Sequence, residues 1–151
     1  MKKYWPFSDT THEEISFYEG ESKFLSDYEN CIEKERNLFC AWWCQAEVLN
    51  GGLEQFFFND TGVLAPEAVQ AFYALNAPEL AQSLEKAMSI FGSKYPRNRE
   101  LRHSILASVL ASHADPEQLF GSLDEEFCNL LYEENGGLEH LAIEYCKEKS
   151  L

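Results

Sequence analysis

Histidine and carboxylate side chains are the groups in this sequence that could act as catalytic acids or bases. The four histidines lie far apart in the chain, at His12, His103, His113 and His140. None belongs to an H-E-x-x-H motif, and the chain also lacks G-x-S-x-G, P-loop and G-x-G-x-x-G patterns. Carboxylates are so numerous that a pair at a catalytic spacing can arise by chance. We therefore expect a protein that binds another macromolecule and is not an enzyme.

Cysteine could supply metal ligands or a reactive thiol. The chain has five, which are Cys31, Cys40, Cys44, Cys128 and Cys146. No two of them form a C-x-x-C pair. Cys40 and Cys44 lie one helical turn apart, but the sequence around them supplies no histidine as a further ligand. We expect reduced, buried thiols, with no metal site and no cofactor.

The acidic side chains outnumber the basic ones by 26 to 12, which gives a formal net charge of −14. The excess lies towards the two ends of the chain: residues 1–60 hold twelve acidic and five basic residues, and residues 115–151 hold ten and two. Such a charge disfavours direct binding to nucleic acid, because phosphate contacts need lysine and arginine. It favours a basic protein partner, although an acidic surface can also serve solubility alone.

The N-terminus begins with basic residues, but no apolar run follows them. Nowhere in the chain do eighteen apolar residues follow one another. We expect neither export nor a membrane span, and hence a cytoplasmic protein.

The elements that must position these side chains are predicted to be helices. Apolar residues repeat at steps of three and four in four segments, residues 38–49, 80–91, 101–110 and 138–146, and no strand-like alternation competes with them. With 151 residues, the chain has about the length of one domain. We predict an all-α, single-domain helical bundle of about six to eight helices.

Two kinds of signal mark predicted helix starts. Prolines suit a first helical turn, which has no use for their missing N–H, and they occur here at Pro66, Pro78 and Pro116. Capping boxes of the form S/T-x-x-E satisfy free backbone N–H groups. They occur at Thr10 with Glu13, Ser26 with Glu29, and Ser122 with Glu125.

One string of five residues, Asn-Gly-Gly-Leu-Glu, occurs twice, at residues 50–54 and 135–139. We expect its glycines to take the left-handed conformation, so that one helix ends and the next begins at once. The first copy continues as Gln55-Phe56-Phe57-Phe58-Asn59 and then reaches Gly62. Three consecutive phenylalanines cannot all face one core from one helix, so we predict that this segment is wedged between elements. Its amides are expected to bond exposed backbone ends, although an amide cluster beside glycines could instead be a ligand pocket.

This extended string resembles the signature of a bacterial family of small acidic helical proteins that includes a DNA-mimic protein. The residues that carry the resemblance, with a structural role expected for them, are Asn50, Gly51, Gly52, Gln55, Phe56, Phe57, Asn59 and Gly62. The similarity extends over about residues 36–146 and includes Trp42 and Glu47, while Leu53 stands where an aromatic residue is common. Residues 1–30 fall outside it and are expected to pack on the same domain, with residues 31–151 forming the DNA-mimic-like domain.

In the mimic member, the resemblance implies, carboxylates imitate the phosphates of duplex DNA and occupy the DNA-binding face of a transcription factor. A compact chain of this size is about 38 Å across, and the matching length of duplex carries roughly 22 charges. The net charge of −14 falls short of that. Mimicry therefore needs the acidic residues on one face, or two subunits joined in a homodimer.

The candidate partner-binding surface consists of carboxylates at one- to two-turn spacing on a predicted helix over residues 122–135, extended by others near the N-terminus. These are Asp124, Glu125, Glu126, Glu133 and Glu134, with Glu13, Glu14, Glu19, Glu21, Asp27 and Glu29. A solvated helix face would show the same pattern. The partner is predicted to be a basic DNA-binding protein, or alternatively a toxin or nuclease that an immunity-type protein blocks.

Overall fold

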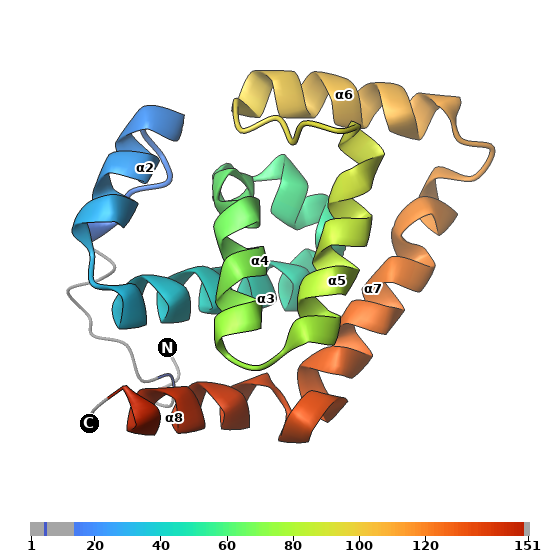
Figure 1. Ribbon diagram of the computed structural model, residues 1–151. Helices are drawn as coiled ribbons and strands as arrows, with labels where there is room; N and C mark the ends of the chain where they lie inside the picture. Colours follow the sequence, from blue (N-terminus) through green and yellow to red (C-terminus); the bar gives the residue numbers. More distant parts are fainter. Residues whose placement is uncertain (1–4, 6–13, 150–151) are drawn as a thin grey trace.

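Helices follow one another through the part of the chain that the computed structural model describes, which is Trp5 and residues 14–149 (Figure 1). The α-helices are α2 (Glu21–Asn30), α3 (Glu33–Phe58), α4 (Ala65–Ala74), α5 (Pro78–Met88), α6 (Arg99–Ser112), α7 (Pro116–Glu133) and α8 (Leu138–Glu148). Short 3₁₀ turns join them: η1 (Asp60–Leu64), η2 (Ser89–Phe91) and η3 (Glu134–Gly136). No strand occurs among these described residues, which confirms the prediction of one all-α domain of six to eight helices.

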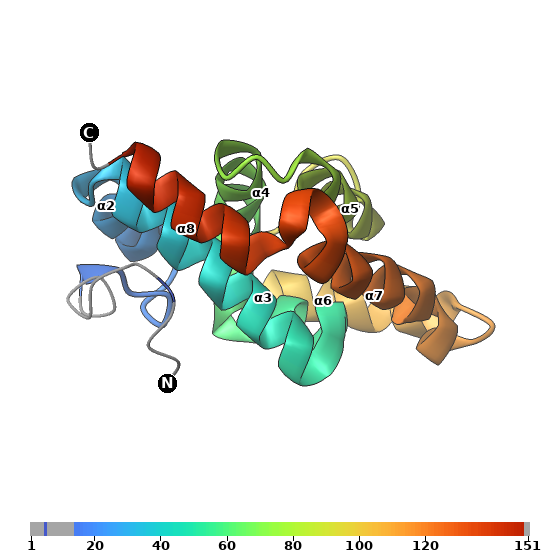
Figure 2. The same ribbon diagram turned by 90° about the horizontal axis from the view of Figure 1, so that it is seen from below.

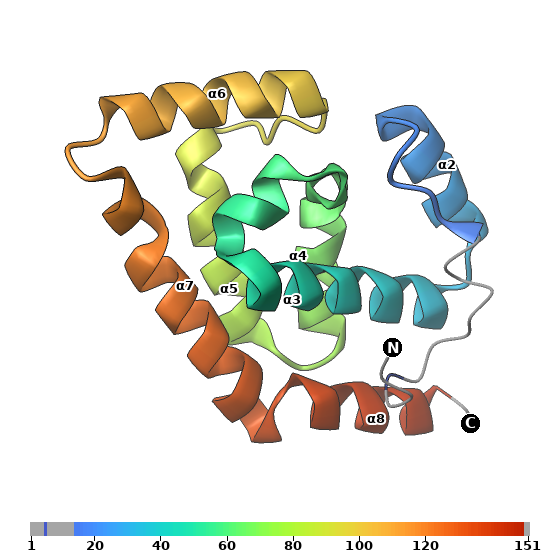
Figure 3. The same ribbon diagram turned by 180° about the vertical axis from the view of Figure 1, so that it is seen from behind.

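The long helix α3 lies at the centre and packs against α4, α6 and α7. Helices α4 and α5 form an antiparallel pair in the middle of the molecule. Helices α6, α7 and α8 run along three of its sides (Figures 1 and 3). The core is built from α3 residues such as Leu38, Phe39 and Phe56, and from Phe72 and Phe127 on α4 and α7. Burying each such side chain stabilises the fold by about 1.5–3 kcal/mol.

The predicted apolar stripes agree with the buried faces of α5 and α8 and disagree at two places. On α3, Leu49 was expected in the core, but its side chain is 47% exposed. On α6, the prediction was built on Leu101, which is 52% exposed, whereas the buried residues are Arg102 and Leu106. The difference on α6 arises because its inner face meets backbone carbonyl groups, to which Arg102 donates hydrogen bonds.

The proline signals predicted helix starts correctly, and the capping boxes did not. Pro66, Pro78 and Pro116 all lie in the first turn of a helix. Ser26 and Ser122 instead lie inside α2 and α7, because those helices already begin after Gly20 and at Pro116. The third box, Thr10 with Glu13, lies outside the described residues.

Both Asn-Gly-Gly strings form tight corners, as predicted. Gly52, Gly136 and Gly137 have φ angles of 80°, 95° and 97°, which glycine adopts without strain. Gly51 differs from the prediction, with φ at −153°. The first corner divides α3 into two segments, and the second separates α7 from α8 (Figure 2).

Within the described residues, none of the helices combines the length and the apolar character that a membrane span requires.

Candidate functional site

The amides of the signature are bonded to a carboxylate, and not to backbone ends as predicted. Gln55 Nε2 and Asn59 Nδ2 donate to the same oxygen of Glu47, at 2.7 Å and 3.0 Å, and Asn50 Nδ2 donates to Gln55 Oε1 at 3.3 Å. The corner at Gly51 makes this possible, because it folds the second segment of α3 back towards Glu47. A Cβ atom on Gly51 would lie 1.9 Å from Gln55 Oε1, so a side chain at this position would displace the Gln55 amide.

The three consecutive phenylalanines point in different directions, as the sequence required. Phe56 and Phe57 are fully buried, whereas Phe58 is 50% exposed. The Phe58 ring stacks on His103, with ring centroids 4.1 Å apart and planes 8° apart. The guanidinium carbon of Arg99 lies 5.9 Å from the centre of the same ring. Phe58 therefore contacts the start of α6.

Arg102 binds the C-terminal end of the signature to α6 from inside the core. Its side chain is fully buried and donates to the carbonyl oxygens of Phe57 at 2.6 Å, Asn59 at 2.8 Å and Arg97 at 2.8 Å. Burial lowers the pKa of this guanidinium below its ordinary value. Gly62 leaves the necessary room, since a Cβ atom there would approach Arg102 Nε to 2.7 Å. Arg102 was not among the residues predicted from the sequence, where the available signal was a charged residue beside an apparent apolar stripe.

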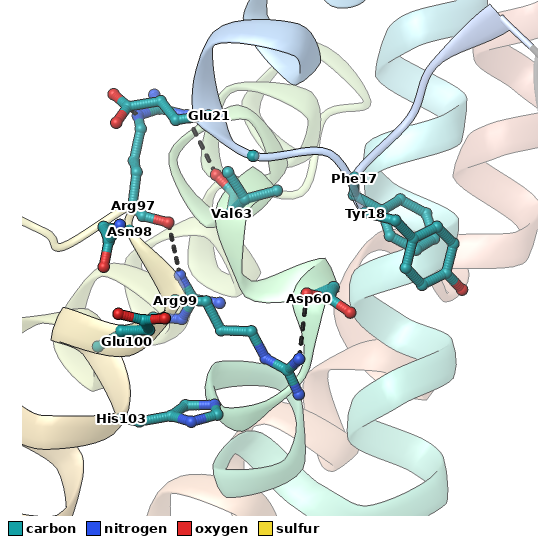
Figure 4. A pocket seen from close by; sticks show the side chains of 12 residues that line it. Phe17, Tyr18, Glu21, Asp60, Val63, Arg97, Asn98, Arg99, Glu100 and His103 are labelled. Atoms are coloured by element: carbon teal, nitrogen blue, oxygen red, sulfur yellow. Dashed lines mark hydrogen bonds and ion pairs between the residues drawn. The ribbon is translucent and has the colours of Figure 1, made fainter.

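A polar pocket of about 430 Å³ lies between the segment before α2 and the start of α6 (Figure 4). Its cationic side chains already have partners. Arg97 pairs with both oxygens of Glu67, at 2.6 Å and 2.7 Å, and Arg99 lies 3.4 Å from Asp60. His103 lies beside Arg99, and its Nε2 donates to the carbonyl oxygen of Phe58. An anion would have to displace Asp60 from Arg99 or Glu67 from Arg97. The geometry around this pocket therefore supports a structural role for the signature, and not a ligand-binding one.

The predicted acidic surface is only partly formed by α7. Glu125, Glu126 and Glu133 are exposed on this helix, and Glu126 lies 3.9 Å from Lys86. Asp124 is half-buried and accepts a hydrogen bond of 2.8 Å from the backbone N–H of Leu53. Burial raises the pKa of Asp124 above its ordinary value, although that hydrogen bond opposes the shift. Asp124 therefore holds α7 against the corner of α3.

Glu134 does not belong to the surface. Its side chain is buried, and its two carboxylate oxygens accept hydrogen bonds of 2.8 Å from the backbone N–H groups of Glu79 and Leu80. These N–H groups open α5, where no intrahelical acceptor exists for them. A carboxylate is favoured at that helix end, so the negative charge of Glu134 stabilises α5.

The carboxylates near the N-terminus do not extend the surface of α7. Helix α2 and helix α7 lie at opposite ends of the molecule in every view (Figures 1 and 2). Glu14, Glu19, Glu21 and Glu29 are exposed there. Asp27 is 11% exposed and pairs with Lys23 at 2.7 Å. Glu13 lies outside the described residues.

Helix α8 supplies an exposed carboxylate that was not among the residues predicted from the sequence. From below, α8 and α7 follow one another end to end across the molecule (Figure 2). Four exposed carboxylates form what we call the acidic edge, which consists of Glu125, Glu126 and Glu133 on α7 and Glu139 at the start of α8. Glu148 does not belong to it, because it follows Glu139 by nine residues and therefore lies on the opposite face of α8. The signal for Glu139 was present in the chain, because this residue lies outside the apolar stripe at Leu138, Leu141 and Ala142.

Comparison with known proteins identifies a family. The model of the family described as DMP19-like protein matches residues 30–149. Neither the curated proteins nor the solved structures give a match.

Proposed function

This chain belongs to the DMP19-like protein family, and from that membership we propose that it is a DNA mimic that occupies the DNA-binding face of a transcription factor or another DNA-binding protein. The acidic edge is the observation that carries the proposal. Its carboxylates are exposed along α7 and at the start of α8, beside the corner where the two helices meet, so a basic protein surface could contact several of them together (Figure 2). The activity proposed is binding, with no catalytic step.

The charge density of α7 determines how much of a DNA duplex the edge can imitate. Helix α7 has 18 residues and is therefore about 27 Å long. A duplex of that length carries roughly 16 charges, about half of them on each strand. Four carboxylates of α7 are exposed, those of Glu117, Glu125, Glu126 and Glu133. One copy therefore imitates part of the phosphate row of a single strand. Two copies joined end to end would imitate a longer part of that row.

The test is a pull-down with the tagged protein from its native lysate, eluted first with excess duplex DNA and then with high salt, and read by mass spectrometry. Mimicry requires that the duplex release a DNA-binding protein, because both ligands compete for one basic face. A triple variant of the edge, Glu125→Gln with Glu126→Gln and Glu133→Gln, should capture at least about tenfold less, since exposed charge carries the attraction.

The matched control removes three exposed carboxylates elsewhere, by Glu19→Gln with Glu29→Gln and Glu100→Gln. It has the same net charge as the edge variant and should capture as much partner as the wild type. Equal capture by the edge variant would contradict the assignment of the surface. If the duplex releases nothing and salt releases a toxin or nuclease, the protein is of the immunity type and the proposal of mimicry is wrong.

A further inference from the structure

A small groove with aromatic walls lies beside the acidic edge, between α3, the end of α7 and the start of α8. Its volume is about 200 Å³, below the roughly 300–1,000 Å³ that is typical of small-molecule sites. A groove of this size fits a single side chain. We call it the aromatic groove, and the residues that line it include Trp5, Trp42, Leu49, Leu131, Tyr132 and Glu139.

The residues of the aromatic groove are of the types that are typical of the centre of a protein interface. Tyr132 is 70% exposed and Leu49 is 47% exposed, although both are large side chains on ordered helices. Trp42 forms another wall, and its ring is held edge-on against Trp43 at 4.9 Å. Tryptophan and tyrosine dominate the binding energy of protein interfaces because they offer a large area with few rotatable bonds.

The charge in the groove favours a cationic occupant. Glu139 is the charged side chain among the described residues that line it. No lysine or arginine occurs among the described residues that line it. An arginine side chain suits such a place best, because its planar guanidinium stacks on aromatic rings and pairs with carboxylates, and because it is less strongly hydrated than an ammonium group.

We propose that the aromatic groove binds an arginine side chain of the basic partner protein, while the acidic edge contacts the basic residues around it. This inference rests on the proposed function, since it names the anchor of the same partner. It also accounts for the low charge of the edge. Phosphates alone offer no aromatic contact, so the groove supplies affinity that DNA lacks, and it selects one partner among proteins that bind DNA.

The experiment uses the whole protein and synthetic pentapeptides, acetyl-Lys-Lys-Xaa-Lys-Lys-amide, in which Xaa is arginine, lysine or norleucine. Calorimetry gives the affinities, and the indole N–H signal of Trp42, identified by its loss in Trp42→Phe, reports occupancy. The arginine peptide should bind about threefold or more tightly than the lysine peptide, which carries the same charge, and the norleucine peptide should bind most weakly. This preference should disappear in Tyr132→Ala and in Glu139→Gln.

The control is Tyr18→Ala. Tyr18 is 71% exposed and Tyr132 is 70% exposed, but Tyr18 lines the polar pocket and not the aromatic groove. It should keep the full preference for arginine. Equal binding of the arginine and lysine peptides by the wild type would overturn the proposal, as would tightest binding of the norleucine peptide. A dimer in sedimentation that Tyr132→Ala dissociates would also overturn it, because a second copy would then fill the groove.

The peptide result and the duplex-release result are independent of each other. The peptides contain no DNA-binding protein, so a preference for arginine can hold even when the duplex releases no partner from the lysate. In that outcome the groove stands and DNA mimicry fails. A released DNA-binding protein without any preference for arginine would keep the proposed function and reject the groove as its anchor.

Discussion

Glu133 and Glu134 are neighbours in the chain and have opposite roles. Glu133 is exposed at the end of α7 and belongs to the acidic edge, while Glu134 is buried and caps α5. The two side chains diverge because α7 ends at Glu133, while the backbone of Glu134 is extended, with ψ at 118°. A row of carboxylates in a sequence therefore contains both residues that remain exposed to a partner and residues that hold the fold.

Glu134→Ala should lower the free energy of unfolding by about 2–4 kcal/mol, because two backbone N–H groups lose a charged acceptor. Glu133→Ala is the control and should change it by less than about 0.5 kcal/mol. Urea unfolding followed by circular dichroism measures both values. Equal effects of the two substitutions would show that the cap at α5 contributes nothing.

Asp124 should make stability depend on pH in a definite direction. Burial raises its pKa in the folded state above the ordinary value of 3.8, so the folded protein holds this proton more tightly than the unfolded chain does. The Asp124→Asn variant keeps an oxygen that can accept from the Leu53 N–H. The stability of the wild type relative to this variant should therefore fall as pH rises from about 3.8 through the raised pKa, and then stay constant.

Chemical unfolding of both proteins between about pH 3 and pH 7 measures this difference, and the other carboxylates cancel in it. If the stability of the wild type relative to Asp124→Asn rises with pH, the folded state favours the ionised form of Asp124, which is contrary to the effect of burial.

At the scale of elements, Arg102 connects the end of the signature to α6. The segments it joins contain Phe57 and Asn59 on one side and Pro96 and Arg97 on the other, and all four carbonyl groups accept from its guanidinium. Tyr95 adds a hydrogen bond of 2.6 Å to the carbonyl oxygen of Gly62. The signature thus fixes the position of a helix more than 40 residues later in the chain.

Arg102→Met should destabilise the protein by more than about 3 kcal/mol, because several buried carbonyl groups would lose their donor. Arg102→Lys should recover only part of this loss, since one ammonium group cannot reach both segments as a planar guanidinium does. Arg99→Met, at an exposed position three residues earlier, is the control and should cost less than about 1 kcal/mol. Thermal unfolding distinguishes these outcomes, and equal loss in both methionine variants would contradict the connecting role.

At the scale of the whole molecule, the formal charge of −14 should make stability depend on salt. Repulsion among exposed carboxylates opposes the compact state, and added salt screens it. We expect the unfolding midpoint to rise by about 2–4 °C between low salt and 0.5 M NaCl, which corresponds to about 1 kcal/mol. The triple glutamine variant of the acidic edge should unfold at a higher temperature than the wild type at low salt, and the two should converge as salt is added. A midpoint that falls with salt would show that attractive ion pairs dominate.

The sequence by itself determined the elements and the family. Helical periodicity, proline positions and paired glycines act within a few residues, so they indicated an all-α domain, the buried faces of α5 and α8, and two tight corners. The family likewise follows from the sequence alone, because the model of the DMP19-like family matches residues 30–149.

Only the tertiary structure decided which charged groups remain available. The burial of Glu134, the bonding of Asp124 to Leu53 and the distance between α2 and α7 depend on segments more than 50 residues apart. Local periodicity carries no information about such contacts, because a carboxylate has the same sequence context whether it meets water or a helix end. For the same reason the acidic edge and the aromatic groove became visible only after α3, α7 and α8 had been packed together.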